Sequence, residues 1–391
     1  MTVLVCFALV PARPVRAGGS GDGRIHGEIR TRDGRVLDGR MEWGPGRAFW
    51  DQTISGVYDE RLDIGERTEK IEVFGLKLWE WKEKQHLYLS IRVPFGQIER
   101  IERVDDETAR LTLRDGAEVG IQRGSRRFDP TDGEIRIETL VGPQEIRWDE
   151  VDVVTFRPSS DPAPGAPERL YGTVETTDGS FTGFVAWDRD ETRLDESLDG
   201  DEGEFLFRDI AEIRQDGSRA SRVVLRDGRE VRLSGTNDVN RANRGIEIEA
   251  GTLGRVTVEW ESFVSFRLAD PPSSPAWETF TGGPIRGKVV TVDGSVHAGT
   301  VVWGGHERFA WEAIDGEIAS GIAVAIPFSN TRSVEPLPEG GAVVELLDGT
   351  RRKVYGDDTA ADARPIAVRG ANGSTTIPWA DVARVEFGGR P

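Results

Sequence analysis

The chain has 391 residues, which is enough for two to four domains of roughly 100–200 residues each. Its 68 acidic residues outnumber the 50 Lys and Arg residues, and the net charge of −18 argues against binding to nucleic acids and to anionic membrane surfaces. Only 37% of the residues are apolar and 47 are glycine, so several small cores are favoured over one large core.

The N-terminus predicts export. An apolar run up to Val10 is followed by a small residue, Ala17, and a glycine-rich stretch, so residues 1–17 are interpreted as a signal peptide and the chain as periplasmic or secreted. The run lacks a preceding Lys or Arg, so a chance apolar tail is the alternative. The single cysteine, Cys6, would leave with the signal, and no later stretch approaches the 18 apolar residues of a membrane span.

Three segments of the chain repeat one pattern. Each opens with a glycine, alternates apolar and polar residues up to an Asp-Gly pair, and continues through a second glycine to a tryptophan. The openings are 27–34, 172–179 and 287–294, and the tryptophans are Trp43, Trp187 and Trp303. Alternation broken by Asp-Gly predicts β-hairpins.

Each repeat then closes in the same way. A phenylalanine block (Phe95, Phe207, Phe328) is followed by a second strand-Asp-Gly segment and by a closing segment that begins with Trp148, Trp260 or Trp379. In 377–387 the spacing of apolar residues changes from three to two, which predicts a strand, a 3₁₀ turn and a second strand. Because all six tryptophans recur at fixed positions, we interpret them as core anchors rather than platforms for stacking carbohydrate.

The first repeat carries an insertion at about 60–93, for which we predict a long hairpin that turns at Lys82–Gln85. Apolar residues fall on both of its faces, so one face needs a partner. The predicted partner-binding residues are Trp79, Trp81, Lys82, Lys84 and Tyr88. Packing on a neighbouring domain of the same chain is the alternative.

The repeats define three β domains, here called unit 1 (23–157), unit 2 (168–269) and unit 3 (283–388). Proline-rich linkers at 158–167 and 270–282 separate them. This pattern of glycine-rich strands with a 3₁₀ turn before the last strand resembles SH3-like small barrels of the Sm-like and PRC-barrel kind. The resemblance implies an all-β fold of three tandem repeat domains, each a pair of small barrels or half-barrels, and an adaptor role.

Motifs for chemistry are missing from the sequence. The four histidines (His26, His86, His297, His306) show no zinc-ligand spacing, and phosphate-binding loops and nucleophile elbows do not occur. The acidic run at 188–204 could offer oxygen ligands to Ca²⁺, but it does not fit the EF-hand spacing and is better interpreted as a solvated hairpin loop. We therefore predict no catalytic residues, no metal and no cofactor.

The expected function is that of a non-catalytic binding or scaffolding protein of the cell envelope, acting through a protein partner. It could be an accessory subunit of a membrane-bound complex. The alternative is a carbohydrate-binding or polysaccharide-active envelope protein. Carboxylate pairs of the glycosidase kind cannot be judged from sequence, because their separation depends on the fold.

Overall fold

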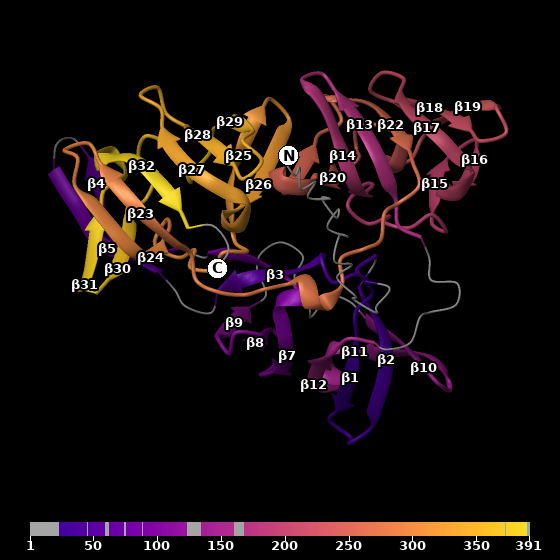
Figure 1. Ribbon diagram of the computed structural model, residues 1–391, viewed down its shortest axis with the longest axis horizontal. Coiled ribbons are helices and arrows are strands. Elements are labelled where there is room, and N and C mark those ends of the chain that lie inside the picture. The colour runs from indigo at the N-terminus through magenta and orange to yellow at the C-terminus, as the bar shows by residue number, and fades with distance from the viewer. Residues whose placement is uncertain are drawn as a thin grey trace, which may run out of the picture.

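The computed structural model describes residues 23–44, 46–58, 89–122, 134–159, 168–371 and 373–388, and the backbone of two strands at 62–73 and 76–87. It confirms the all-β class, since every described helical segment is a three-residue 3₁₀ turn. Figure 1 shows most strands of the three units as three groups around a common centre, with unit 1 at the bottom, unit 2 at the upper right and unit 3 at the upper left. The predicted signal peptide lies outside the described residues.

Unit 1 contains twelve of the described strands. They are β1 (His26–Thr31), β2 (Val36–Trp43), β3 (Thr53–Tyr58), β4 (Leu62–Val73), β5 (Leu76–Leu87), β6 (Ser90–Pro94), β7 (Ile98–Arg103), β8 (Thr108–Leu113), β9 (Glu118–Gln122), β10 (Glu134–Thr139), β11 (Gly142–Arg147) and β12 (Val151–Phe156). The 3₁₀ turns are η1 (Phe95–Gln97) and η2 (Trp148–Glu150).

Units 2 and 3 contain the remaining strands. Those of unit 2 are β13 (Tyr171–Thr176), β14 (Gly179–Ala186), β15 (Ser197–Gly200), β16 (Gly203–Leu206), β17 (Ile210–Gln215), β18 (Ala220–Leu225), β19 (Glu230–Ser234), β20 (Ile246–Glu249), β21 (Arg255–Val258) and β22 (Phe263–Leu268). Those of unit 3 are β23 (Arg286–Thr291), β24 (Val296–Val302), β25 (Ala313–Ala319), β26 (Ile322–Pro327), β27 (Thr331–Pro336), β28 (Ala342–Leu346), β29 (Arg351–Val354), β30 (Ile366–Gly370), β31 (Gly373–Ile377) and β32 (Val382–Phe387). The 3₁₀ turns are η3 (Phe207–Asp209), η4 (Asn237–Val239), η5 (Gly251–Leu253), η6 (Trp277–Thr279), η7 (Phe328–Asn330) and η8 (Trp379–Asp381).

One strand order recurs in the three units. The orders β12-β1-β2-β10-β11, β22-β13-β14-β20-β21 and β32-β23-β24-β30-β31 are equivalent, and each is continued by a second three-stranded series such as β7-β8-β9. The turn η8 lies between β31 and β32, which confirms the strand, 3₁₀ turn and strand predicted for 377–387.

The hairpin that precedes the phenylalanine block has a different place in each unit. In unit 1, β3 and β6 extend the sheet of their own unit, whereas in unit 2 β15 and β16 form a separate two-stranded sheet. In unit 3 the hairpin β25-β26 leaves its own sheet and joins that of unit 2, where β26 pairs antiparallel with β21. Units 2 and 3 are therefore joined by a continuous sheet.

Backbone geometry explains the recurring Asp-Gly and glycine positions. At the first turn, Gly34 has a φ of 89° and the Asp33 carboxylate accepts the backbone N–H of Arg35, as expected for a hairpin turn. The repeated glycines of the strands serve a different purpose. A Cβ on Gly39 would lie 2.0 Å from the carbonyl oxygen of Glu138 on the neighbouring strand, so only glycine allows the two strands to approach.

Tryptophans anchor two hydrophobic cores. All six repeated tryptophans are at most 5% exposed, which confirms the core-anchor prediction (Trp43, Trp148, Trp187, Trp260, Trp303, Trp379). One core belongs to unit 1, and the other runs without a break through units 2 and 3. Phe309 and Trp311 of unit 3 are buried in the core of unit 1, so the three units pack against one another.

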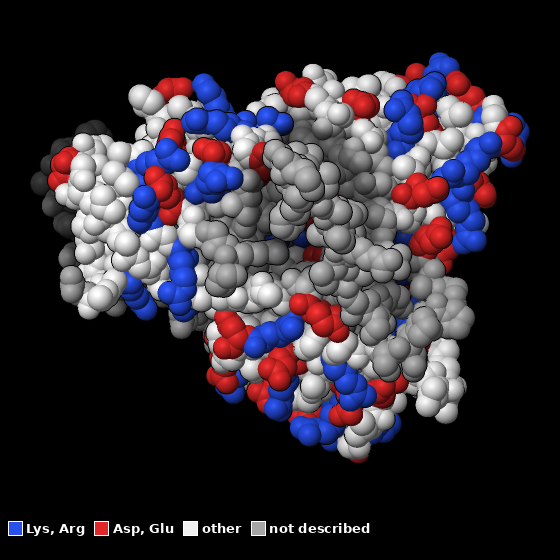
Figure 2. All heavy atoms as spheres, in the orientation of Figure 1, with Lys and Arg blue, Asp and Glu red and all other residues white. Residues whose placement is uncertain are grey.

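The described surface carries both signs of charge. Figure 2 shows Lys and Arg interspersed with Asp and Glu over the described residues of this face, rather than gathered into a basic stripe. Within the described part of the chain, no helix has the length and apolar character that crossing a membrane requires.

Candidate functional site

A cavity of about 940 Å³ lies where the three units meet, and residues of every unit line it. The unit 1 wall comes from β6 and the residue before it. The unit 2 walls come from β21 and from three loops, and the unit 3 walls come from β25, β26 and the loops after β24 and β29. The charged lining residues include Arg92, Arg255, His306, Glu307, Asp315 and Asp358. This volume suits a small-molecule ligand.

The floor of the cavity is the sheet that joins units 2 and 3. Because side chains alternate along a strand, Val324 and Ile326 of β26 enter the core while Ala323 and Ala325 face the opposite side, and both alanines line the cavity. The strand register places Ala325 between Arg255 on β21 and Asp315 on β25. Two small side chains between charged ones leave open space above the floor.

Arg255 is held in place on this floor by carboxylates of β20. Its guanidinium lies 2.9 Å from Glu249 and 3.8 Å from Glu247. Burial works against the charge of Arg255, but Glu249 and Glu247 outweigh burial and raise its pKa. Burial likewise opposes the charge of Glu247, and Arg255, Arg92 and Arg189 together keep its pKa low.

The unit 3 wall is mainly acidic. Glu307 is 7% exposed, and one of its carboxylate oxygens contacts Nε2 of His306. The other oxygen, Oε2, is buried and has no hydrogen-bond partner among the described residues. Asp358 accepts the backbone N–H of Asp315 at 2.8 Å. Burial, followed by the charge of Glu307, raises the pKa of Asp358 to about 7.

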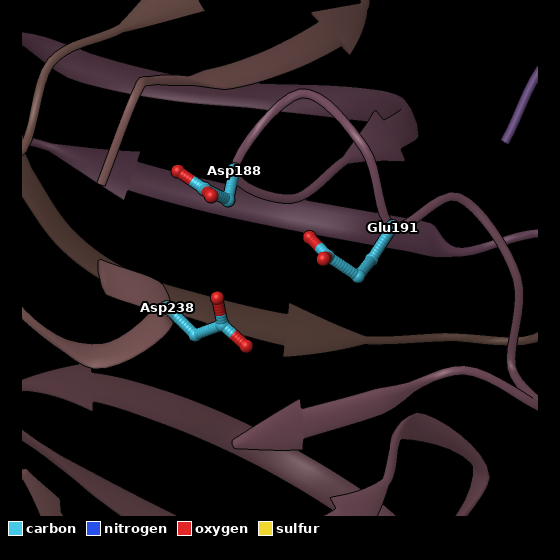
Figure 3. Close-up of side chains that lie close together, drawn as sticks. All are labelled: Asp188, Glu191 and Asp238. Carbon is cyan, nitrogen blue, oxygen red and sulfur yellow. The ribbon is translucent and has the colours of Figure 1, made fainter. Parts of the chain in front are cut away.

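Three carboxylates of unit 2 lie close together, and one of them, Glu191, stands at the repeat position that Glu307 has in unit 3 (Figure 3). Asp188 and Glu191 lie on the loop after β14 and Asp238 on η4, with carboxylate oxygens within 4.8 Å of one another and the Glu191 carboxylate pointing toward the other two. Asp188 is fully buried and accepts hydrogen bonds from the backbone and side chain of Arg244. An all-oxygen set of this kind could hold a hard divalent cation.

The burial of Asp188 corrects part of the sequence interpretation. The run 188–204 was predicted to be a solvated hairpin loop, and its later part does form the hairpin β15-β16 with Asp201 and Glu202 exposed at the turn. The first residue of the run, Asp188, is instead buried, because Arg244 and Asn237 donate hydrogen bonds to its carboxylate in place of water.

The Glu191 carboxyl is expected to make the stability of the protein depend on pH. Burial, followed by the charge of Asp238, raises its pKa to about 8, so from about pH 5 to 8 the folded protein keeps a proton that the unfolded chain has lost. Stability should therefore fall as pH rises through this window and level off above it. Glu191→Gln should leave the unfolding temperature unchanged near pH 5 and raise it at pH 9 by about 2–8 °C, or roughly 1–2 kcal/mol after discounting for partial exposure.

The control for this prediction is Glu204→Gln, which changes an exposed carboxylate of the same run. Differential scanning calorimetry of the wild type and both variants at pH 5, 7 and 9 makes the comparison. An equal response of Glu191→Gln and Glu204→Gln at pH 9 would show that the carboxylate cluster does not retain the proton.

The loop after the first tryptophan is fixed in the same way in all three units. Nine residues after the first tryptophan, a side-chain oxygen of Gln52, Glu196 or Glu312 accepts two successive backbone N–H groups of its own loop. Glu312 also accepts the hydroxyl of Tyr58 at 2.6 Å, which ties unit 3 to unit 1. Burial, followed by the charge of Glu312, raises the pKa of Tyr58, so this hydroxyl stays a donor.

Unit 2 is tied to unit 1 by similar contacts. Arg169 places one guanidinium nitrogen 2.9 Å from both carboxylate oxygens of Asp51, and Thr192 donates to the carbonyl of Gly46 at 2.9 Å. The segment after unit 2 adds a third contact, because Arg114 stacks on Trp277 and donates to its carbonyl. These contacts hold the walls of the cavity at fixed positions.

The predicted partner-binding residues Trp79, Trp81, Lys82, Lys84 and Tyr88 have side chains outside the described residues. The insertion does form a hairpin, but the predicted turn at Lys82–Gln85 is wrong. Lys82–Gln85 lies inside β5, and the pairing of β5 with β4 continues from there to Ile71 with Trp79 and Val73 with Leu76. The end of the predicted insertion, Ser90–Pro94, belongs to β6, which pairs with β3.

Sequence reasoning missed the cavity residues because they are scattered from Arg92 to Asp358. One signal was present, since a glutamate stands four residues after the first tryptophan in units 2 and 3, as Glu191 and Glu307, where unit 1 has Arg47. Comparison with known proteins adds no assignment, since no family model and no curated protein matches the chain.

Proposed function

We propose that the chain is a non-catalytic binding protein of the cell envelope and that its ligand site is the cavity between the three units. The observation that carries this proposal is the joint construction of the cavity, whose floor exists only because β26 of unit 3 pairs with β21 of unit 2. Two alanines leave its centre open while charged groups surround it. A polar ligand could satisfy such groups, including the buried oxygen of Glu307.

Filling the cavity tests this proposal. Ala325→Phe places a ring over the floor next to Arg255, and phenylalanine is well tolerated in strands. We expect at least one class of compound in a panel of sugars, polyols, amines, amino acids and carboxylates to raise the unfolding temperature of the wild type. A ligand present at 100 times its dissociation constant stabilises a protein by about 2.7 kcal/mol. Ala325→Phe should lose this response.

The matched control is Thr375→Phe, which adds the same ring to an exposed position of β31. It should respond to ligand as the wild type does. Circular dichroism checks that both variants keep the β fold. A panel that stabilises none of the proteins, or that stabilises Ala325→Phe equally, would contradict the proposal.

The hairpin β4-β5 supports a second candidate function, the binding of a protein partner. Each strand is twelve residues long, and among the described strands the two pair only with each other. Unpaired strand edges are ready templates for an added strand from another chain. This supports the proposed role as a scaffold or as an accessory subunit of a membrane-bound complex. Tyr355, an exposed aromatic residue of the cavity, in turn keeps the carbohydrate alternative open.

Deleting residues 62–87 tests the partner function. The deletion leaves five residues between β3 and β6, a length that suits a hairpin loop, so the fold and the ligand response should be kept. Cross-linking in the native host followed by mass spectrometry should identify a partner of the wild type and of Ala325→Phe that the deletion variant lacks. Retention of the same cross-links by the deletion variant would refute the role of the hairpin.

A further inference from the structure

The cavity brings a cation and carboxylates to different walls. Arg92 stands on β6 of unit 1, between the buried residues Ile91 and Val93, so its exposed side chain faces the cavity that it lines. Burial raises the pKa of Asp315 on the floor, and the charge of Arg92 is the largest of the causes that oppose this rise. Ion pairs join Arg255 to Glu249 and Arg244 to Asp188, but no ion pair within 4 Å joins Arg92 to another described residue.

Glu307 is the counterpart of Arg92 on the unit 3 wall. It is more than nine-tenths buried, lines the cavity, and keeps one carboxylate oxygen without a donor among the described residues. A buried carboxylate oxygen is costly unless a donor reaches it, and a charged donor gives the stronger bond. Asp315 and Asp358 add acceptors on the same side.

The space between the two walls is set by the floor. Ala323 and Ala325 occupy the middle of the sheet, and the register puts Thr257 and Arg255 on one side of them and Glu317 and Asp315 on the other. A ligand that lies over the alanines can therefore reach both walls. The volume of about 940 Å³ leaves room for more than a single amino acid.

We propose that this cavity binds a small zwitterion, an amino acid or a short peptide, whose ammonium group lies at Glu307 and whose carboxylate lies at Arg92. This inference rests on the proposed function of the cavity as a ligand site. A dianion would meet the like charges of Glu307 and Asp315 on the unit 3 wall, and a simple amine would leave Arg92 unpaired. A neutral sugar would cover the charged side chains of both walls without supplying an opposite charge to either of them. An ammonium and a carboxylate on one molecule satisfy the two walls together.

Isothermal titration calorimetry with matched probes tests the proposal on the full chain. The probes are glycine, diglycine, triglycine and tetraglycine, which separate the two charges stepwise, together with the twenty L-amino acids. The C-terminal amide of each of these glycine probes keeps only the ammonium, and its N-acetyl form keeps only the carboxylate. Glucose and N-acetylglucosamine represent neutral ligands. We expect one length of zwitterion to bind at least about tenfold more tightly than its two capped forms, as loss of one charge-assisted contact implies.

Two variants assign the ends of the ligand. Arg92→Gln should weaken zwitterion binding by about tenfold or more but leave the affinity for the amide unchanged, and Glu307→Gln should do the same for the acetylated probe. Arg110→Gln and Glu118→Gln change exposed residues of β8 and β9 and should bind as the wild type does. Because Glu307 is buried, its variant is first checked by circular dichroism, and the capped probes test the same contact on the unmodified protein.

The possible results separate this inference from the proposed function. Capped probes that bind as tightly as zwitterions, or full affinity in Arg92→Gln and Glu307→Gln, would overturn the zwitterion assignment. Binding of a sugar that Ala325→Phe abolishes, with no binding of any zwitterion, would overturn it while leaving the cavity as a ligand site. The absence of binding by every probe would overturn both.

Discussion

Replacing Trp187 with alanine is expected to lower the free energy of unfolding by about 3–5 kcal/mol, the usual cost of truncating a large core aromatic. Trp187 is completely buried, with ring centroids 5.4 Å from Phe263 and 5.9 Å from Phe266. Its indole N–H also donates to the carbonyl of Asp238 at 2.9 Å, and the variant would leave that buried carbonyl without its donor.

Urea unfolding followed by circular dichroism measures this effect. Trp187→Phe should lower the free energy of unfolding by less than Trp187→Ala does, because phenylalanine keeps part of the ring packing. Leu140→Ala changes a fully exposed side chain and should shift the free energy of unfolding by less than about 0.5 kcal/mol. A loss below about 1 kcal/mol for Trp187→Ala would mean that this tryptophan does not anchor the core.

Unit 2 without unit 3 is expected to be far less stable than the full chain. Residues 168–270 would lack β26, and the edge of β21 that now pairs with it would be exposed. The core would lose Ile314, Ile322 and Ile326, which are completely buried in the full chain and belong to the same continuous cluster. We therefore expect this fragment to aggregate or to unfold at a much lower temperature than the full chain.

Size-exclusion chromatography with light scattering and thermal unfolding check this expectation. The full chain serves as the reference, because it keeps both the strand pairing and the contacts with unit 1. A monomeric fragment 168–270 with the unfolding temperature of the full chain would show that the pairing of β26 with β21 contributes nothing to stability.

Local features of the fold were predictable from the sequence because they depend on short-range chemistry. An Asp-Gly pair between alternating residues specifies a turn, as at Asp33-Gly34, and a tryptophan at a fixed place in a β pattern marks the core, as at Trp187. The spacing in 377–387 likewise indicated the turn η8.

Long-range features were not predictable in the same way. The three hairpins before the phenylalanine block look alike in sequence, yet only β25-β26 joins the sheet of another unit. That choice depends on which edge lies open after the units pack, and local periodicity does not contain this information. The cavity depends on the pairing of β26 with β21, which is why Arg92 belongs to no sequence motif and Glu307 is marked only by its position four residues after Trp303. The turn predicted at Lys82–Gln85 is wrong because a run of polar residues is also compatible with a strand, as it is here in β5.

A crystal structure of the full chain grown with the tightest-binding probe tests the central claim most directly. We expect ligand density over Ala323 and Ala325, enclosed by β6 of unit 1 and the His306-Glu307 loop of unit 3, with β26 paired to β21. Ligand bound elsewhere on the molecule, or a structure in which β26 pairs within its own unit and the cavity is absent, would contradict the proposed ligand site.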